Sequence, residues 1–104
     1  MIKISELYPY GEGNVFDMHY YLAKHIPLVR RLTGAALRKV EVEEGIGGLA
    51  AGSSPVYLAM GHLFFESVET FQAAFEPHAA EITGDIRNYT NTKPTIQISE
   101  VKLF

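Results

Sequence analysis

The sequence predicts one α+β domain, residues 1–104, in which two helices cover one face of a four-stranded antiparallel sheet. Three observations lead to this prediction. The chain has 104 residues, which is the usual length of a single domain. Segments of period two and of helical period follow in the order strand, helix, strand, strand, helix, strand. Hydrophobic residues make up 47% of the chain, which provides a core and excludes a disordered protein.

The first strand and the first helix are predicted at residues 1–9 and 15–32. Pro9 ends the strand, and a turn with two glycines follows it. Asn14 or Asp17 can cap the helix by accepting bonds from its first N–H groups, and Gly34 stops it. Its apolar stripe at helical spacing consists of Met18, Tyr21, Leu22, His25, Val29 and Leu32.

Residues 37–46 and 56–66 are predicted to form the second and third strands. The second alternates polar and apolar residues, as does a strand with one wet face near a sheet edge. Residues 47–55 are small and uncharged, which is typical of a hairpin loop with some freedom to move. The third strand is apolar at almost every position, so we expect it to be covered on both faces.

The second helix is predicted at residues 67–83, and a last strand at 94–104. Ser67 caps the helix and Gly84 closes it, and a polar connection follows at 85–93. The apolar stripe of this helix consists of Phe71, Ala74, Phe75, His78 and Ile82.

This order of elements is that of a ferredoxin-like βαββαβ domain, with both helices on one face of the sheet. The other face is left bare, although the third strand is apolar on both sides. Packing that face against a second copy would remove it from water, at about 25 cal/mol per Å² of apolar area. The sequence therefore predicts a homodimer joined through the sheet face.

Composition argues against several classes of function. The net charge is −3 and no basic run is present, so nucleic-acid binding is not expected. The chain has no cysteine, which excludes disulfides and thiolate chemistry and suits a cytoplasmic location. No stretch resembles a signal peptide or a membrane-spanning helix. No motif for a metal or another cofactor is present, and none is predicted.

Two histidines lie in the middle of the apolar helix stripes and are the main candidates for chemistry. Pro27 follows His25 closely, and Pro77 precedes His78. A proline inside a helix removes an N–H and bends the helix, so both helices can open beside a histidine. His25 and His78 are thus expected to face one pocket between helices and sheet. A buried neutral imidazole there can act as a base, although a structural histidine bonded to a carbonyl is an equally simple explanation.

Other side chains complete the predicted site. Tyr21 lies one turn before His25 and can bond to it, so these two residues and His78 form the candidate catalytic set. The candidate ligand-binding residues are His62, Phe75, Met60 and Tyr20. His62 and Met60 lie on one face of the third strand, and the sequence leaves open whether this face looks toward the pocket or toward a partner. A small apolar or aromatic compound is the expected ligand.

Several segments resemble the EthD family. The most specific is Tyr21-x-x-x-His25-x-Pro27-Leu28, preceded by Asp17-Met18; Gly61-His62-Leu63-Phe64-Phe65, Pro77-His78 and the strand from Ile96 to Val101 also agree. The resemblance covers nearly the whole chain. It implies a dimeric α+β barrel built from ferredoxin-like halves, with a ligand between sheet and helices. The family takes its name from a gene cluster for ethyl tert-butyl ether degradation, and it brings no agreed catalytic set.

Two functions follow from these expectations. The first is a cofactor-independent oxidoreductase, monooxygenase or isomerase that acts on a small apolar or aromatic compound in an oxidative degradation or biosynthetic pathway, with His25 as base or orienting group. The second is a non-catalytic accessory or carrier protein for a hydrophobic pathway intermediate. A purely structural dimer whose histidines only pack is the third interpretation.

Overall fold

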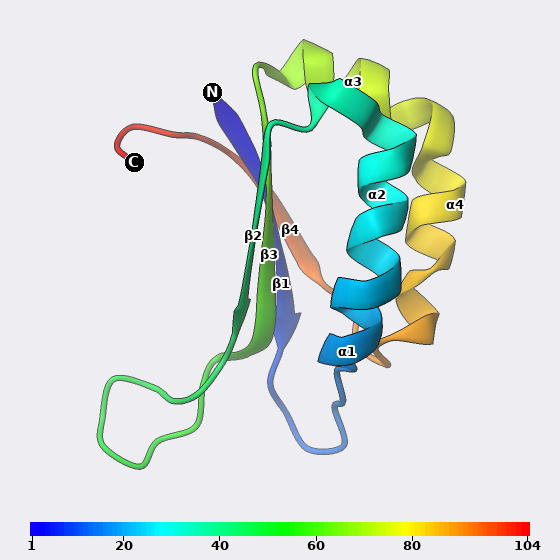
Figure 1. Ribbon diagram of the computed structural model, residues 1–104. Coiled ribbons are helices and arrows are strands. Elements are labelled where there is room, and N and C mark those ends of the chain that lie inside the picture. The colour runs from blue at the N-terminus through cyan, green and yellow to red at the C-terminus, as the bar shows by residue number, and fades with distance from the viewer.

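A computed structural model describes all residues 1–104. It contains a four-stranded antiparallel sheet with the helices on one face, as Figure 1 shows. The spatial order of the strands is β2-β3-β1-β4, so the predicted ferredoxin-like βαββαβ arrangement is confirmed. The strands are β1 (Ile2–Pro9), β2 (Lys39–Glu44), β3 (Tyr57–Phe65) and β4 (Thr95–Glu100).

The first helical segment begins at Met18, three residues later than the prediction. The side chain of Asp17 caps it by accepting a bond from the backbone N–H of Tyr20, whereas the amide of Asn14 donates to the carbonyl of Pro9. The segment consists of α1 (Met18–Tyr20), the π-helical turn η1 (Tyr21–His25) and α2 (Ile26–Thr33), and Gly34 ends it with φ of 63° before a short 3-10 turn, η2 (Gly34–Ala36).

The bend expected at Pro27 takes the form of this π-helical turn. Pro27 has no N–H to offer the carbonyl of Ala23, four residues earlier. Just before it, the N–H of Ile26 bonds to the carbonyl of Tyr21, five residues back. Leu22, which the apolar stripe included, is 52% exposed on the outer side of this turn.

The second helical segment consists of several short pieces. Ser67 caps it as predicted, by accepting a bond from the N–H of Thr70. The pieces are α3 (Val68–Phe75), the 3-10 turn η3 (Glu76–His78) at Pro77, α4 (Ala79–Gly84) and a further 3-10 turn, η4 (Ile86–Asn88), inside the predicted polar connection. Strand β4 ends at Glu100, earlier than predicted, and the last four residues leave the sheet. None of these helices has both the length and the hydrophobicity to cross a membrane.

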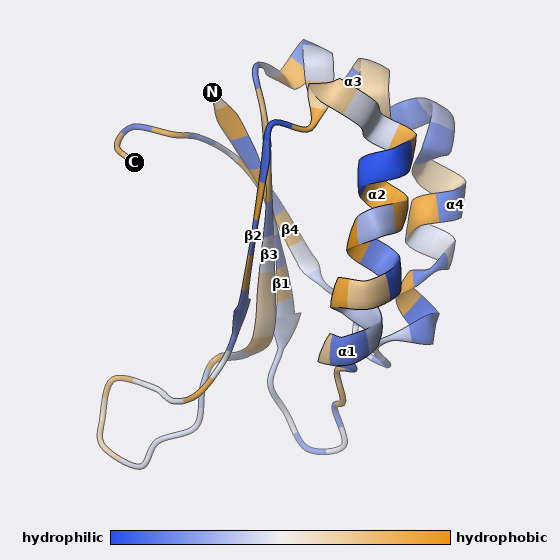
Figure 2. Ribbon diagram, in the orientation of Figure 1, coloured by the Kyte–Doolittle hydropathy of each residue, from blue (hydrophilic) through white to orange (hydrophobic).

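Strand register decides which side chains face the helices. Residues directly opposite each other share a face, so the side chains of Ile4, Leu63 and Glu6 point toward the helices, and Gly61 lies opposite Glu6 on that face. The main core cluster lies between these strands and the helices and includes Ile2, Ile4, Val29, Leu63, Phe65 and Ile82. Figure 2 shows hydrophobic and hydrophilic residues alternating along α2, as expected for a helix with one covered side.

The opposite face of the sheet carries no helix (Figure 1). It presents Leu7, Met60, His62 and Phe64, which the register places on the side away from the helices. Phe64 is only 3% exposed there, because Phe104 and the ammonium group of Lys39 lie over its ring. The C-terminal residues of the chain thus cover part of the apolar surface that the sequence assigned to a second copy.

Candidate functional site

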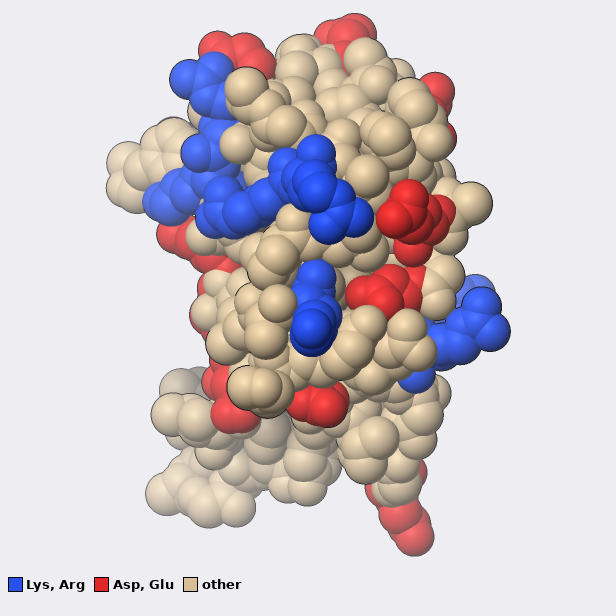
Figure 3. Space-filling view, turned by 45° about the vertical axis from the view of Figure 1, so that its right-hand side comes forward, with Lys and Arg blue, Asp and Glu red and all other residues tan.

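Glu6 and Asp85 stand apart from the other carboxylates of this protein. The chain has 12 acidic residues, and all except these two are exposed. Figure 3 shows acidic and basic side chains near one another on the surface. Exposed ion pairs of this protein include Arg31–Glu81 and Arg38–Glu66. Exposed pairs of this kind contribute at most about 1 kcal/mol. Because charged groups normally stay in water, the two carboxylates that are partly withdrawn from it are candidates for function.

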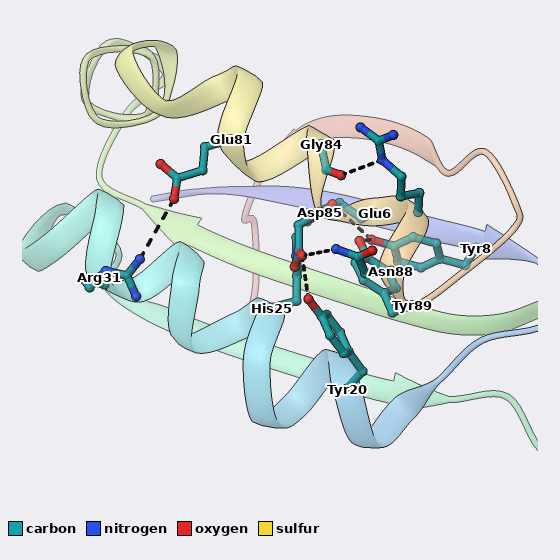
Figure 4. Close-up of polar contacts among 11 residues, drawn as sticks. Glu6, Tyr8, Tyr20, His25, Arg31, Glu81, Gly84, Asp85, Asn88 and Tyr89 are labelled. Atoms are coloured by element: carbon teal, nitrogen blue, oxygen red, sulfur yellow. Dashed lines mark hydrogen bonds and ion pairs between the residues drawn. The ribbon is translucent and has the colours of Figure 1, made fainter.

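Asp85 holds a cluster of four residues, Tyr20, His25, Asp85 and Asn88, which we call the Asp85 cluster (Figure 4). Asp85 Oδ1 accepts from the Tyr20 hydroxyl at 2.6 Å and from the Asn88 amide at 2.9 Å. Its Oδ2 lies 2.9 Å from Nδ1 of His25, which is only 1% exposed. Burial works against ionisation of Asp85, but the bonds from Tyr20, Asn88 and His25 outweigh it and keep its pKa below the usual value.

His25 is held as a neutral ring with a defined tautomer. Burial lowers its pKa more than the bond to Asp85 raises it. The carboxylate of Asp85 accepts the proton on Nδ1, so Nε2 is the nitrogen that can accept another proton. The ring stacks on Tyr21, with centroids 5.4 Å apart, and contacts Tyr89 at 4.6 Å. The expected hydrogen bond between Tyr21 and His25 is not formed.

Glu6 lies at the start of a second hydrogen-bonded set, which we call the Glu6 chain: Glu6, Tyr8 and Tyr89 (Figure 4). The hydroxyl of Tyr8 donates to Glu6 Oε2 at 3.2 Å and lies 2.7 Å from the hydroxyl of Tyr89. Burial raises the pKa of Glu6 to about 7, although the bond from Tyr8 opposes the change. Burial also raises the pKa of Tyr8 and of Tyr89, so both hydroxyls stay protonated at neutral pH.

An apolar cavity of about 120 Å³ lies between the sheet and the helical segments, and Glu6 lines it. Nine of its 12 lining residues are hydrophobic, and Glu6 is the only charged one. Ile4, Leu63 and Phe65 form the sheet side, and Phe71 and Phe75 belong to α3. Two lining residues, Thr83 and Ile96, are exposed, which places the mouth of the cavity between α4 and β4.

The structure places the residues predicted for the site in four different environments. Phe75 lines the cavity. Tyr20, Tyr21 and His25 pack beside it, in the aromatic cluster around Tyr89. His78 ends η3 at the other end of α4 from Asp85 and does not line the cavity, so the structure does not bring it together with His25.

His62 and Met60 lie on the far face of the sheet, opposite Ser5 and Leu7. His62 is 8% exposed and sits between two partners, with Nδ1 2.8 Å from the Ser5 hydroxyl and Nε2 3.0 Å from Glu43 Oε1. The alternative that the sequence left open is thereby decided, since neither side chain faces the cavity. No group of three or more histidine, aspartate or glutamate side chains is arranged to hold a metal ion.

Sequence reasoning missed Glu6, Asp85 and the role of Tyr8. A signal for Glu6 was present, because Ile2, Ile4, Glu6 and Tyr8 alternate along one strand and therefore share one face. An acidic residue in that series indicates either an exposed end or a buried carboxylate. Asp85 carried no such signal, since its partner His25 is 60 residues away in the chain.

Comparisons with known proteins agree on one family. Residues 15–93 match the model of the EthD domain. A crystal structure of an EthD-like protein from Ralstonia eutropha JMP134 is 45% identical, with a TM-score of 0.93, over 98% of this chain and 92% of that one. No curated protein matches the chain.

Two more distant structures show the same fold. One is an ethyl tert-butyl ether D (EthD) family protein from Bacillus halodurans C-125, with 24% identity and a TM-score of 0.64 over 97% of this chain and 98% of that one. The other is a protein from Arabidopsis thaliana, with 12% identity and a TM-score of 0.67 over 100% and 98% of the two chains.

Tyr21 and Gly61 allow a test of the packing beside Glu6. The Tyr21 hydroxyl is buried without a hydrogen-bond partner, and a Cβ at Gly61 would lie 2.2 Å from it but 3.4 Å from the ring carbon that carries it. We expect Gly61→Ala to cost about 2–4 kcal/mol of unfolding free energy, and less than about 1 kcal/mol in the Tyr21→Phe background. Tyr21→Phe alone should be neutral or stabilising. Urea unfolding measures all three, and equal costs of Gly61→Ala in both backgrounds would contradict the contact.

The pKa of Glu6 predicts a pH dependence of stability. Below about pH 4.5 this carboxyl is protonated in both the folded and the unfolded chain, so its burial has no penalty for ionisation. As the pH rises toward 7, only the unfolded chain ionises freely, and the wild type loses stability. Relative to wild type, Glu6→Gln should therefore gain about 1–3 kcal/mol between pH 4 and pH 8. Urea unfolding at the two values checks this, with the exposed Glu12→Gln as control; a constant difference would refute it.

Proposed function

Because this chain belongs to the EthD family, we propose that it binds a small, largely apolar or aromatic compound in the cavity that Glu6 lines. Small-molecule sites are concave and mostly apolar, with a few polar groups that fix the orientation of the ligand. A cavity of about 120 Å³ is close to the volume, about 150 Å³, that accommodates one benzene ring in a protein core. The ligand is therefore of the size of a single ring.

The observation that carries this proposal is the Glu6 carboxyl group at the wall of an otherwise apolar cavity, where burial raises its pKa to about 7. A group that titrates near the working pH can both accept and return a proton. Proton transfer to and from a bound compound is the chemistry that this protein offers with its own residues. Such a step suits a cofactor-free oxidoreductase, monooxygenase or isomerase that acts on a small compound, and the Bacillus relative is named after one, ethyl tert-butyl ether.

In this proposal His25 and Tyr21 are positioning residues. Neither lines the cavity, whereas both pack against Tyr89, whose hydroxyl bonds to that of Tyr8. The bond from His25 to Asp85 fixes the imidazole against the ring of Tyr89. The Asp85 cluster thus helps to fix the position of the Glu6 chain. In this proposal Glu6, and not His25, is the group that contacts the ligand.

The alternative function is a non-catalytic carrier or accessory protein for a hydrophobic intermediate. The cavity favours it as much as it favours an enzyme, because the same apolar walls shield an intermediate from water. The two differ in the fate of the bound compound: a carrier releases it unchanged, and an enzyme exchanges its protons or converts it.

Ile96 at the mouth of the cavity and Ile98 on the same face of β4 provide a matched test of binding. Both are about half exposed, but only Ile96 lines the cavity. Wild-type protein should bind toluene with a Kd on the order of 0.1–1 mM in an NMR titration. Ile96→Trp should weaken binding at least about tenfold by filling the mouth, and Ile98→Trp should leave it unchanged. Equal affinity in the two variants, or no binding to the wild type, would rule out this cavity.

We further propose that two copies of the chain pair through the far face of the sheet. Leu7, Met60 and His62 lie on that face, and no helix covers them. Removing this area from water favours association.

Sedimentation velocity tests the pairing. Wild-type protein should sediment as a dimer at about 50 µM, because this concentration is well above the expected dimer Kd, which is on the order of 1 µM. Met60→Lys should give monomers because it places a charge in the middle of the face. The control is Leu22→Lys, an equally drastic change at an exposed position on the helix side. A monomeric wild type, or dimers of Met60→Lys, would refute the proposal.

A further inference from the structure

We propose that the compound in the cavity is a neutral molecule with a single hydroxyl group, which donates its hydrogen bond to the carboxylate of Glu6. This inference rests on the proposed binding function and names the class of ligand. It follows from the hydrogen-bonding groups that line the cavity, considered one by one.

Glu6 has one carboxylate oxygen to offer. Its Oε2 already accepts the bond from the hydroxyl of Tyr8, which is itself bonded to Tyr89. Its Oε1 has no hydrogen-bond partner in the protein, and Glu6 lines the cavity, so we assign this oxygen to a molecule bound there. A carboxylate accepts hydrogen bonds and donates none.

The only other polar side chains of the cavity are those of Thr33 and Thr83. Both hydroxyls donate to carbonyls of their own helix at 2.7 Å, Thr33 to Val29 and Thr83 to Ala79. Their protons are therefore used within the protein. A ligand whose only polar group is an acceptor finds no donor here while Glu6 is ionised, whereas a hydroxyl finds Glu6.

The charge and volume of the cavity narrow the class of possible ligands further. The cavity contains no cation, and an anionic ligand would be placed beside a second negative charge in an apolar space. A second polar group on the ligand would face side chains such as Leu63, Phe65 and Phe71 without a partner, which is costly. A volume of about 120 Å³ leaves room for one ring or a compact branched alkyl group besides the hydroxyl.

Phenol and toluene have nearly the same shape and differ in the hydroxyl, so their relative affinity tests the inference. Phenol stays neutral throughout the range used, because a phenolic hydroxyl titrates near ~10. In wild-type protein the affinity of phenol relative to toluene should rise about tenfold between pH 5.5 and pH 8.5, as Glu6 becomes a charged acceptor. In Glu6→Gln the ratio should not depend on pH, and Glu12→Gln should behave as wild type.

The outcomes separate this inference from the proposed function. If toluene binds but the phenol-to-toluene ratio is the same at both pH values, or changes with pH in Glu6→Gln as well, the hydroxyl assignment is overturned while the binding function stands. If benzoate binds as tightly as phenol at pH 8.5, the neutral class is overturned. If neither toluene nor phenol binds, the binding function fails and this inference with it. NMR titration with observation of the cavity methyl groups measures all of these, and unperturbed spectra of Glu6→Gln establish that it is folded.

Discussion

The partial burial of the Glu6 carboxyl group, on the core side of the sheet, determines the chemistry proposed for this protein. Glu6 lies on the helix-facing side of the inner strand β1, where its neighbours Ile4 and Tyr8 are core residues. An ionised carboxylate in an apolar space is unfavourable unless it is paired. Glu6 has one hydrogen bond from Tyr8, and no cation lines the cavity beside it. The pKa of Glu6 therefore moves to about 7, where the group exchanges a proton easily. This placement of Glu6 lowers the free energy of unfolding at neutral pH, but it provides a carboxyl group that can act as an acid or a base.

The surroundings of Glu6 make this placement possible. Gly61 lies opposite it in the register and leaves room for the Tyr21 side chain, so three tyrosines gather next to the carboxyl. The π-helical turn before Pro27 carries Tyr21 and His25, stacked ring on ring. The Asp85 cluster then ties this turn to the residues after α4. One side of the cavity is thus held by polar bonds from both helical segments.

Sequence patterns predicted the fold and the order of its elements, because a strand or helix with one buried face has apolar residues at a characteristic spacing along the chain. These patterns placed His25 and Tyr21 in the interior, but they did not identify the residues that these two contact. Asp85 lies in a polar connection, and only the closing of the chain brings it to His25. The expected meeting of His25 and His78 did not occur, because His78 lies just before α4, whereas His25 of η1 bonds to Asp85 just after it. Similarly, the apolar third strand suggested a partner on its far face, and part of that cover comes from Phe104 of the same chain.

The pH at which Glu6 ionises in the folded protein decides whether this carboxyl can exchange a proton near neutral pH. Carbon-detected NMR of the side-chain carboxyl groups between pH 4 and pH 9, with Glu6→Gln used for assignment, follows this group by itself. We expect a midpoint near 7 for Glu6. A midpoint below about 5, close to the value of a glutamate in water, would contradict the buried carboxyl and the proton chemistry derived from it.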